Sequence, residues 1–150
     1  MADNQKEPWR LADKDTSEPN TGRDAIARAE ALIATGYSTS AMLSITGPSA
    51  GGIIAGHAMT ERPDLFGSAV AWVTVVNTLR AEFMAAGPAN SRVRYLKDRH
   101  GFSSLLGMNT VQHVRTGIRN PAVLITAGLN NSRVEPWTGA RLAETLQKSK

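Results

Sequence analysis

One serine in this sequence stands in a pattern suited to nucleophilic chemistry. Residues 47–51 read Gly-Pro-Ser-Ala-Gly, so Ser49 has a glycine two positions before it and another two positions after it. A serine that attacks a carbonyl carbon must project from a sharp turn between a strand and a helix, and small residues on both sides relieve the crowding there. Gly52 extends the small stretch. A purely structural glycine-rich turn would explain the glycines, but not their placement around one serine.

The residues on either side of this motif predict the strand and the helix that such a turn requires. Residues 42–46 form a short apolar run that ends at Gly47, as in a buried parallel strand. Residues 50–60 begin with small side chains, continue with apolar ones at helical spacing, and end before Pro63, which favours a helix. The serine is therefore expected between a strand and a helix.

The rest of the chain predicts an α/β fold. We expect an irregular lead-in over residues 1–22 and one domain over 23–150, because 150 residues suit a single core. Further helices are expected at 24–35 and 138–147, further strands at 68–74 and 122–127, and short helical stretches within 77–120. Strands that alternate with helices, and that are taken as apolar on both sides, predict a parallel sheet with helices on both faces.

Composition excludes several other classes of protein. The net charge of +4 is scattered and only 5% of residues are aromatic, so a nucleic-acid-binding face is not expected. The absence of cysteine excludes disulfides, zinc thiolate sites and cysteine nucleophiles. The three histidines lie 43 and 13 residues apart, which forms no metal-ligand set, and no cofactor is expected. No apolar run approaches the roughly 18 residues of a membrane span, so we expect no membrane association and a cytoplasmic location.

Together with its flanks, the serine motif resembles a known family. Residues 45–52 followed by 61–67 are similar to the catalytic domain of the prolyl oligopeptidase family, which has an α/β-hydrolase fold. The resemblance runs from about Trp9 to the end of the chain, and the other segments that carry it are 20–37, 79–83, 87–90 and 121–134.

The resemblance implies a serine peptidase that cleaves short peptides, with a Ser, Asp, His triad in that chain order and a β-propeller that limits access. Ser49 matches the nucleophile, the backbone N–H of Ala50 matches one oxyanion donor, and Arg133 matches a residue that holds the substrate peptide. The glycines of the elbow are Gly47, Gly51 and Gly52.

The chain departs from the family at the other two members of the triad. Asn131 occupies the position of the acid, and an amide is a poor partner for the imidazolium that forms when the serine proton moves. The base should follow the acid, yet all three histidines, His57, His100 and His113, precede Asn131. We therefore expect this chain to be inactive or impaired as a peptidase.

The resemblance also implies that only part of the catalytic domain is represented. The strands that precede the nucleophile strand, the second oxyanion donor and the β-propeller have no counterpart here. The missing strands should leave apolar surface exposed, which favours self-association or completion by another chain. The tryptophan that stacks on a substrate proline also has no clear counterpart, because Trp72 and Trp137 are better explained as packing residues.

Two functions follow. The first is a fragment of a serine peptidase catalytic domain whose substrate is a peptide. The alternative is a non-catalytic protein that keeps an α/β-hydrolase-like core for binding a peptide or a partner chain.

Overall fold

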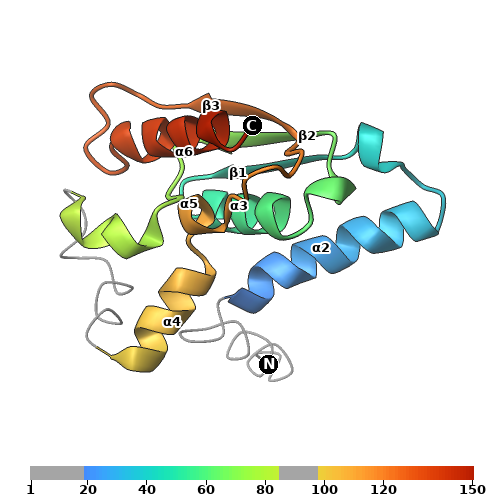
Figure 1. The fold of residues 1–150 in the computed structure, drawn as a ribbon, viewed down its shortest axis with the longest axis horizontal. Helices are drawn as coiled ribbons and strands as arrows, with labels where there is room; N and C mark the ends of the chain where they lie inside the picture. The colour runs from blue at the N-terminus through green and yellow to red at the C-terminus, as the bar shows by residue number, and fades with distance from the viewer. Residues whose placement is uncertain (1–18, 85–97) are drawn as a thin grey trace, which may run out of the picture.

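Three parallel strands form the centre of the molecule. The computed structural model describes residues 19–84 and 98–150. The strands are β1 (Ser44–Pro48), β2 (Ser68–Trp72) and β3 (Ala122–Thr126), side by side in the order β1-β2-β3 (Figure 1). Their last residues pair in register, Pro48 with Trp72 and Trp72 with Thr126. The segments that follow the three strands therefore leave the sheet at one common edge.

Helices connect these strands at the places that the sequence predicts. The α-helices are α2 (Pro19–Ala34), α3 (Gly51–Glu61), α4 (Arg99–Gly107), α5 (Thr110–His113) and α6 (Trp137–Lys148), and the 3-10 turns are η2 (Ser40–Met42), η3 (Pro63–Leu65) and η4 (Thr78–Phe83). The expected strands and helices are confirmed with small shifts at their ends. Helix α2 begins earlier than expected, inside the predicted lead-in, while residues 1–18 of that lead-in lie outside the described residues.

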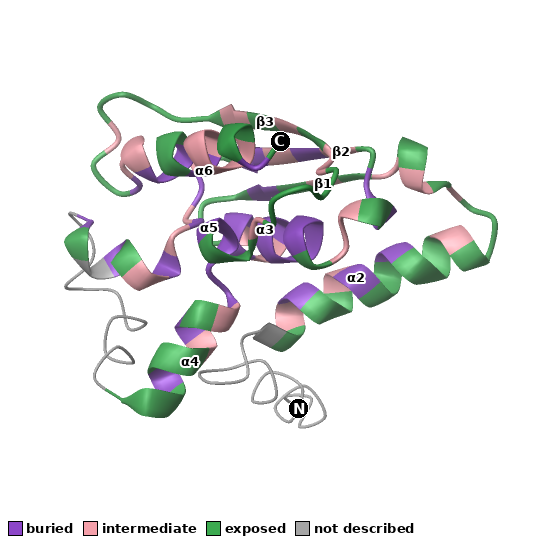
Figure 2. Ribbon diagram, in the orientation of Figure 1, coloured by how far each residue is buried: buried purple, intermediate pink, exposed green. Residues whose placement is uncertain are grey.

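The helices lie on one face of the sheet. Ile45, Ala69 and Val123 are register partners, so their side chains share a face, and this face packs against residues of α3 and α6. On the opposite face Leu124 and Trp72 are 58% and 52% exposed. Figure 2 shows the buried residues gathered on α3 and the strands beside it.

The expected parallel sheet is confirmed, but the expectation of helices on both of its faces is not met by the described residues. The reason is the alternation along the strands. Ser44, Thr46 and Ser68 share the exposed face with Leu124, so the strands are less uniformly apolar than the sequence interpretation assumed.

Apolar contacts join α3 and α6 to the sheet and to each other. Met59 of α3 and Leu142 of α6 are almost fully buried and belong to one cluster with Ala69 and Val76. Each buried side chain of this size contributes about 1.5–3 kcal/mol relative to exposure. Helix α3 is therefore packed between the sheet and its neighbouring helices, and its first residues are those that follow Ser49.

A second cluster holds α2 against α3. Ile26 and Ala29 of α2 pack on Ala58 of α3 and on Phe66. At the surface of this contact Arg62 forms ion pairs with Glu30 of α2 and with Asp64. In the described part of the chain, no helix combines the length and the apolar character needed to cross a membrane.

Candidate active site

Ser49 lies immediately after β1 in a strained backbone conformation. Its φ of 50° places it in the left-handed region that non-glycine residues rarely occupy. Such a conformation costs on the order of 1–3 kcal/mol and persists only where the surroundings impose it. The residue is exposed and α3 begins two positions later, at Gly51. The strand, the sharp turn and the helix that the motif predicts are thus all present.

The glycines of the elbow are required by close contacts. A Cβ at Gly47 would lie 2.0 Å from the carbonyl oxygen of Gly51, and one at Gly52 would lie 1.5 Å from Oγ1 of Thr74. A Cβ at Gly51 would meet Cδ of Pro48 at 3.3 Å, a much milder contact. The glycine before the serine is therefore the most constrained, because its obstacle is backbone that cannot rotate away.

Hydrogen bonds fix the elbow to the end of β2. The backbone N–H of Ser49 donates to the carbonyl of Trp72 at 3.0 Å, and the N–H of Val75 donates to the carbonyl of Ser49 at 3.1 Å. Val73, between these two partners, has a φ of 44°, an unusual value for a β-branched residue. Two strained residues therefore stand next to each other at the carboxyl edge of the sheet.

The N–H of Ala50 is placed where an oxyanion donor would be useful. Ala50 is the N-cap of α3, is exposed, and its N–H has no acceptor among the described residues. The N-terminus of a helix carries a partial positive charge that favours an anion. The turn can therefore present one backbone donor to a developing negative charge beside Ser49.

Asn131, which the sequence analysis expects at the position of the acid, forms hydrogen bonds within its own loop. Asn131 lies in the loop after β3, at the same edge of the sheet as Ser49. Its Oδ1 accepts hydrogen bonds from the backbone N–H groups of Arg133 at 2.9 Å and Val134 at 3.0 Å. This oxygen therefore stabilises its own loop. Arg133 itself is exposed, and its guanidinium has no hydrogen bond or ion pair within the described residues.

The three histidines do not supply a base to Ser49. His57 is buried in α3, and its Nε2 contacts Oε2 of Glu61 at 2.5 Å. His113 donates from Nε2 to the carbonyl of Leu106 at 2.9 Å. His100 is exposed in the first turn of α4. The described residues thus contain an exposed serine in the elbow and no histidine in hydrogen-bond contact with it. They also contain no group of histidine, cysteine and carboxylate side chains that could hold a metal ion.

The sequence analysis did not identify the residues that pack against the elbow. The side chain of Thr74 packs against Gly52, and its carbonyl accepts a hydrogen bond from Oγ1 of Thr138 at 2.9 Å. Thr74 follows β2 and Thr138 lies in α6, so neither is near Ser49 in the sequence. No local pattern could have revealed this contact.

Comparison with known proteins points in one direction. A family model described as the prolyl oligopeptidase family matches residues 3–150. The chain is 31% identical over 134 residues to an uncharacterised peptidase of Rickettsia prowazekii, a match that covers 87% of this chain and 18% of the relative. It is 28% identical over 141 residues to a prolyl endopeptidase of Elizabethkingia meningoseptica, covering 93% of this chain and 20% of that one.

Solved structures agree with this result. A prolyl endopeptidase structure matches with a TM-score of 0.86 and 29% identity, over 95% of this chain and 21% of that chain. Oligopeptidase B from Trypanosoma brucei with covalently bound antipain matches with a TM-score of 0.85 and 30% identity, over 95% and 20%. The chain thus spans about a fifth of the length of the relatives that it matches.

Proposed function

Because this chain belongs to the prolyl oligopeptidase family of serine peptidases, we propose that it carries the nucleophile part of a peptidase catalytic domain. In this proposal Ser49 is the nucleophile, the N–H of Ala50 is one oxyanion donor, and Arg133 binds the substrate peptide. The observation that carries the proposal is the elbow, in which an exposed serine with a φ of 50° follows a parallel strand and precedes a helix.

We further propose that the 150-residue chain does not hydrolyse peptide bonds efficiently by itself. An unassisted serine hydroxyl is a weak nucleophile, because a base must accept its proton as it attacks. His57 and His113 are engaged in other contacts, and Oδ1 of Asn131 accepts backbone hydrogen bonds. Loss of the acid alone costs on the order of 10⁴ in turnover, and the base is needed as well.

A fluorophosphonate probe tests both parts of this proposal. We expect slow labelling of the purified chain, with Ser49 as the modified residue by mass spectrometry. Labelling should disappear in Ser49→Ala and persist in Ser132→Ala, an exposed serine in the loop of Asn131. Rapid stoichiometric labelling of Ser49 would contradict the inactivity, whereas equal labelling of Ser49 and Ser132 would contradict the assignment of the nucleophile.

A non-catalytic peptide-binding protein is the second candidate function. The observation that favours it is the exposed guanidinium of Arg133, which has five N–H donors and no partner among the described residues. Fluorescence anisotropy with a labelled short peptide tests it. We expect Arg133→Gln to weaken binding by roughly tenfold, the size of one charge-assisted hydrogen bond, and Arg119→Gln to leave it unchanged. Equal affinities in both variants would remove this candidate.

The exposed face of the sheet supports one further part of the proposal, namely that this face is covered by association. Leu124 and Trp72 are large, apolar and more than half exposed on that face. Sedimentation velocity of the purified chain should show concentration-dependent self-association that Leu124→Lys reduces. If the chain is a monomer at all concentrations, self-association is excluded and only covering of this face by a different chain is left.

A further inference from the structure

A separate polar cleft lies toward the other end of α3 from Ser49. Its volume is about 400 Å³, which suits a small ligand. Its walls come from α2, α3, the end of α4, α5 and the segment after α5, and the lining residues that carry the argument are Arg23, His57, Thr60, Glu61, His113 and Arg115. At 1.5 Å per residue, His57 lies about 9 Å along the helix axis from Gly51 at the start of α3. The cleft is thus distinct from the elbow.

Positive charge predominates in this cleft. Arg23 and Arg115 are permanently charged, and among the described lining residues Glu61 alone carries a carboxylate. Glu61 is engaged by Nε2 of His57 at 2.5 Å. The cleft therefore carries an excess of hydrogen-bond donors with positive charge.

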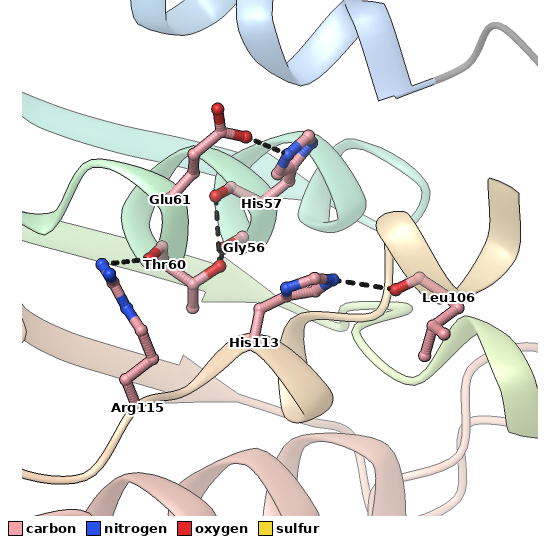
Figure 3. Close-up of polar contacts among 7 residues, drawn as sticks. All are labelled: Gly56, His57, Thr60, Glu61, Leu106, His113 and Arg115. Atoms are coloured by element: carbon pink, nitrogen blue, oxygen red, sulfur yellow. Dashed lines mark hydrogen bonds and ion pairs between the residues drawn. The ribbon is translucent and has the colours of Figure 1, made fainter. Parts of the chain in front are cut away.

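Backbone contacts hold two of the donors in place. Arg115 uses Nη2 to donate to the carbonyl of Thr60 at 3.3 Å, and His113 uses Nε2 to donate to the carbonyl of Leu106 at 2.9 Å. Figure 3 shows His57 and Glu61 projecting from α3 toward α2, with His113 and Arg115 on the other side. The Nε and Nη1 groups of Arg115 have no hydrogen bond within the described residues. The guanidinium of Arg115 is therefore held in place by one hydrogen bond, and its other N–H groups are available to a ligand.

Helix capping alone would explain the contacts of Arg115 and His113, because both reach carbonyls near the ends of helices. Helix capping does not explain why Arg23 also lines the cleft. This residue reaches the cleft from α2, and its guanidinium has no hydrogen bond or ion pair within the described residues. Two arginines from distant parts of the chain thus line one small cleft, with donors free on both.

We propose that this cleft binds a small oxyanion, a phosphate or carboxylate group, with Arg23 and Arg115 as its direct ligands. A planar guanidinium pairs with such a group through two parallel hydrogen bonds, which is the strongest arrangement available to exposed side chains. The site does not depend on Ser49, so it stands or falls independently of the proposed peptidase chemistry.

Titration calorimetry of the purified chain with inorganic phosphate tests the site. We expect saturable binding that weakens about tenfold or more in Arg23→Gln, through loss of a charge-assisted hydrogen bond. Arg23 is exposed, so this variant should keep its fold, which circular dichroism checks. Arg119→Gln is the matched control, because Arg119 is also exposed but lines a different cleft. The proposal would be overturned if neither phosphate nor a peptide carboxylate bound saturably, or if both variants weakened binding equally.

A variant that is expected to strengthen phosphate binding provides a second test. Glu61→Gln removes the carboxylate of the cleft while keeping an oxygen that can accept from His57, so phosphate should bind several-fold more tightly. Unchanged or weaker binding in this variant would contradict the assignment of the cleft.

Trialanine with a free carboxylate, compared with its C-terminal amide, distinguishes the two sources of the oxyanion. Binding of the free acid alone identifies a peptide terminus, and binding of phosphate alone identifies a phosphate group.

Discussion

The turn after β1 and the loop after β3 leave the sheet at the same edge, but they are preserved in different ways. The turn keeps every steric requirement of a nucleophile elbow, with Ser49 at a φ of 50° and Gly47 against the carbonyl of Gly51. In the loop, Asn131 is the residue that the sequence analysis expects at the acid position, and its Oδ1 accepts hydrogen bonds from two backbone N–H groups. Steric contacts therefore constrain the turn, whereas side-chain hydrogen bonds hold the loop.

This difference shows that the backbone conformation of a site and its proton-transfer groups depend on different residues. The elbow depends on small residues that avoid collision, which the fold itself needs in order to pack α3 on the sheet. A catalytic acid and base depend on ionisable groups that contribute little to folding. A chain can therefore meet the first kind of requirement without meeting the second.

The largest expected effect comes from adding a methyl group to the elbow. Gly47→Ala would place a Cβ 2.0 Å from backbone, so we expect a loss of about 3 kcal/mol or more in the free energy of unfolding. The matched change in the other region is Gly128→Ala, whose Cβ would meet Cβ of Asn131 at an ordinary 3.6 Å. Its effect should stay within about 0.5 kcal/mol. Urea unfolding of both variants measures the contrast, and similar losses would show that the two regions are equally constrained.

A moderate effect is expected from changes at Asn131. Asn131→Ala removes the acceptor of two backbone N–H groups and should cost about 1–2 kcal/mol, measured by the same unfolding experiment. Asn131→Asp keeps the acceptor, so its stability should remain near that of the unchanged chain. This variant should still cleave no peptide amide, because no histidine is arranged to act as the base. Measurable cleavage would show that one of the three histidines reaches Ser49.

The smallest effect concerns ion pairs on the surface, at Asp64 and at Glu144. The Arg62 guanidinium holds the pKa of Asp64 below its ordinary value of 3.8, and Lys148, with Arg141, lowers the pKa of Glu144 in α6. A carboxylate whose folded pKa is depressed contributes stability above its ordinary pKa, and this contribution is lost as the pH falls through the folded value.

Comparing two variants at two pH values tests this last point. Asp64→Asn should be slightly less stable than the unchanged chain at pH 6, by roughly the small amount typical of exposed ion pairs, and the difference should shrink at about pH 3. Glu144→Gln should show the same sign, because Lys148 and Arg141 lower the pKa of the carboxylate that this variant removes. Urea midpoints at low salt provide the measurement, and a difference that grows on acidification would contradict the expected sign.

Much of the fold, including the strand-turn-helix context of Ser49, could be predicted from local sequence. The strand that ends at Gly47, the helix that follows and the strand at 122–127 were predicted because apolar periodicity and glycine placement are local signals. The uncovered face of the sheet was not predicted, since a short strand that mixes Ser, Thr and Val does not reveal which side is packed. The supporting contact of Thr74 with Gly52 was missed because the two residues are brought together only by the pairing of β1 with β2.

The sequence by itself determined the position of the elbow between a strand and a helix, because glycine placement and apolar periodicity are local along the chain. The tertiary structure decided which groups are engaged elsewhere. His57 contacts Glu61, Oδ1 of Asn131 bonds to its own loop, and Arg23 and Arg115 line one cleft. Side-chain partners of this kind depend on how helices and loops pack in space, and that information is distributed over the whole chain.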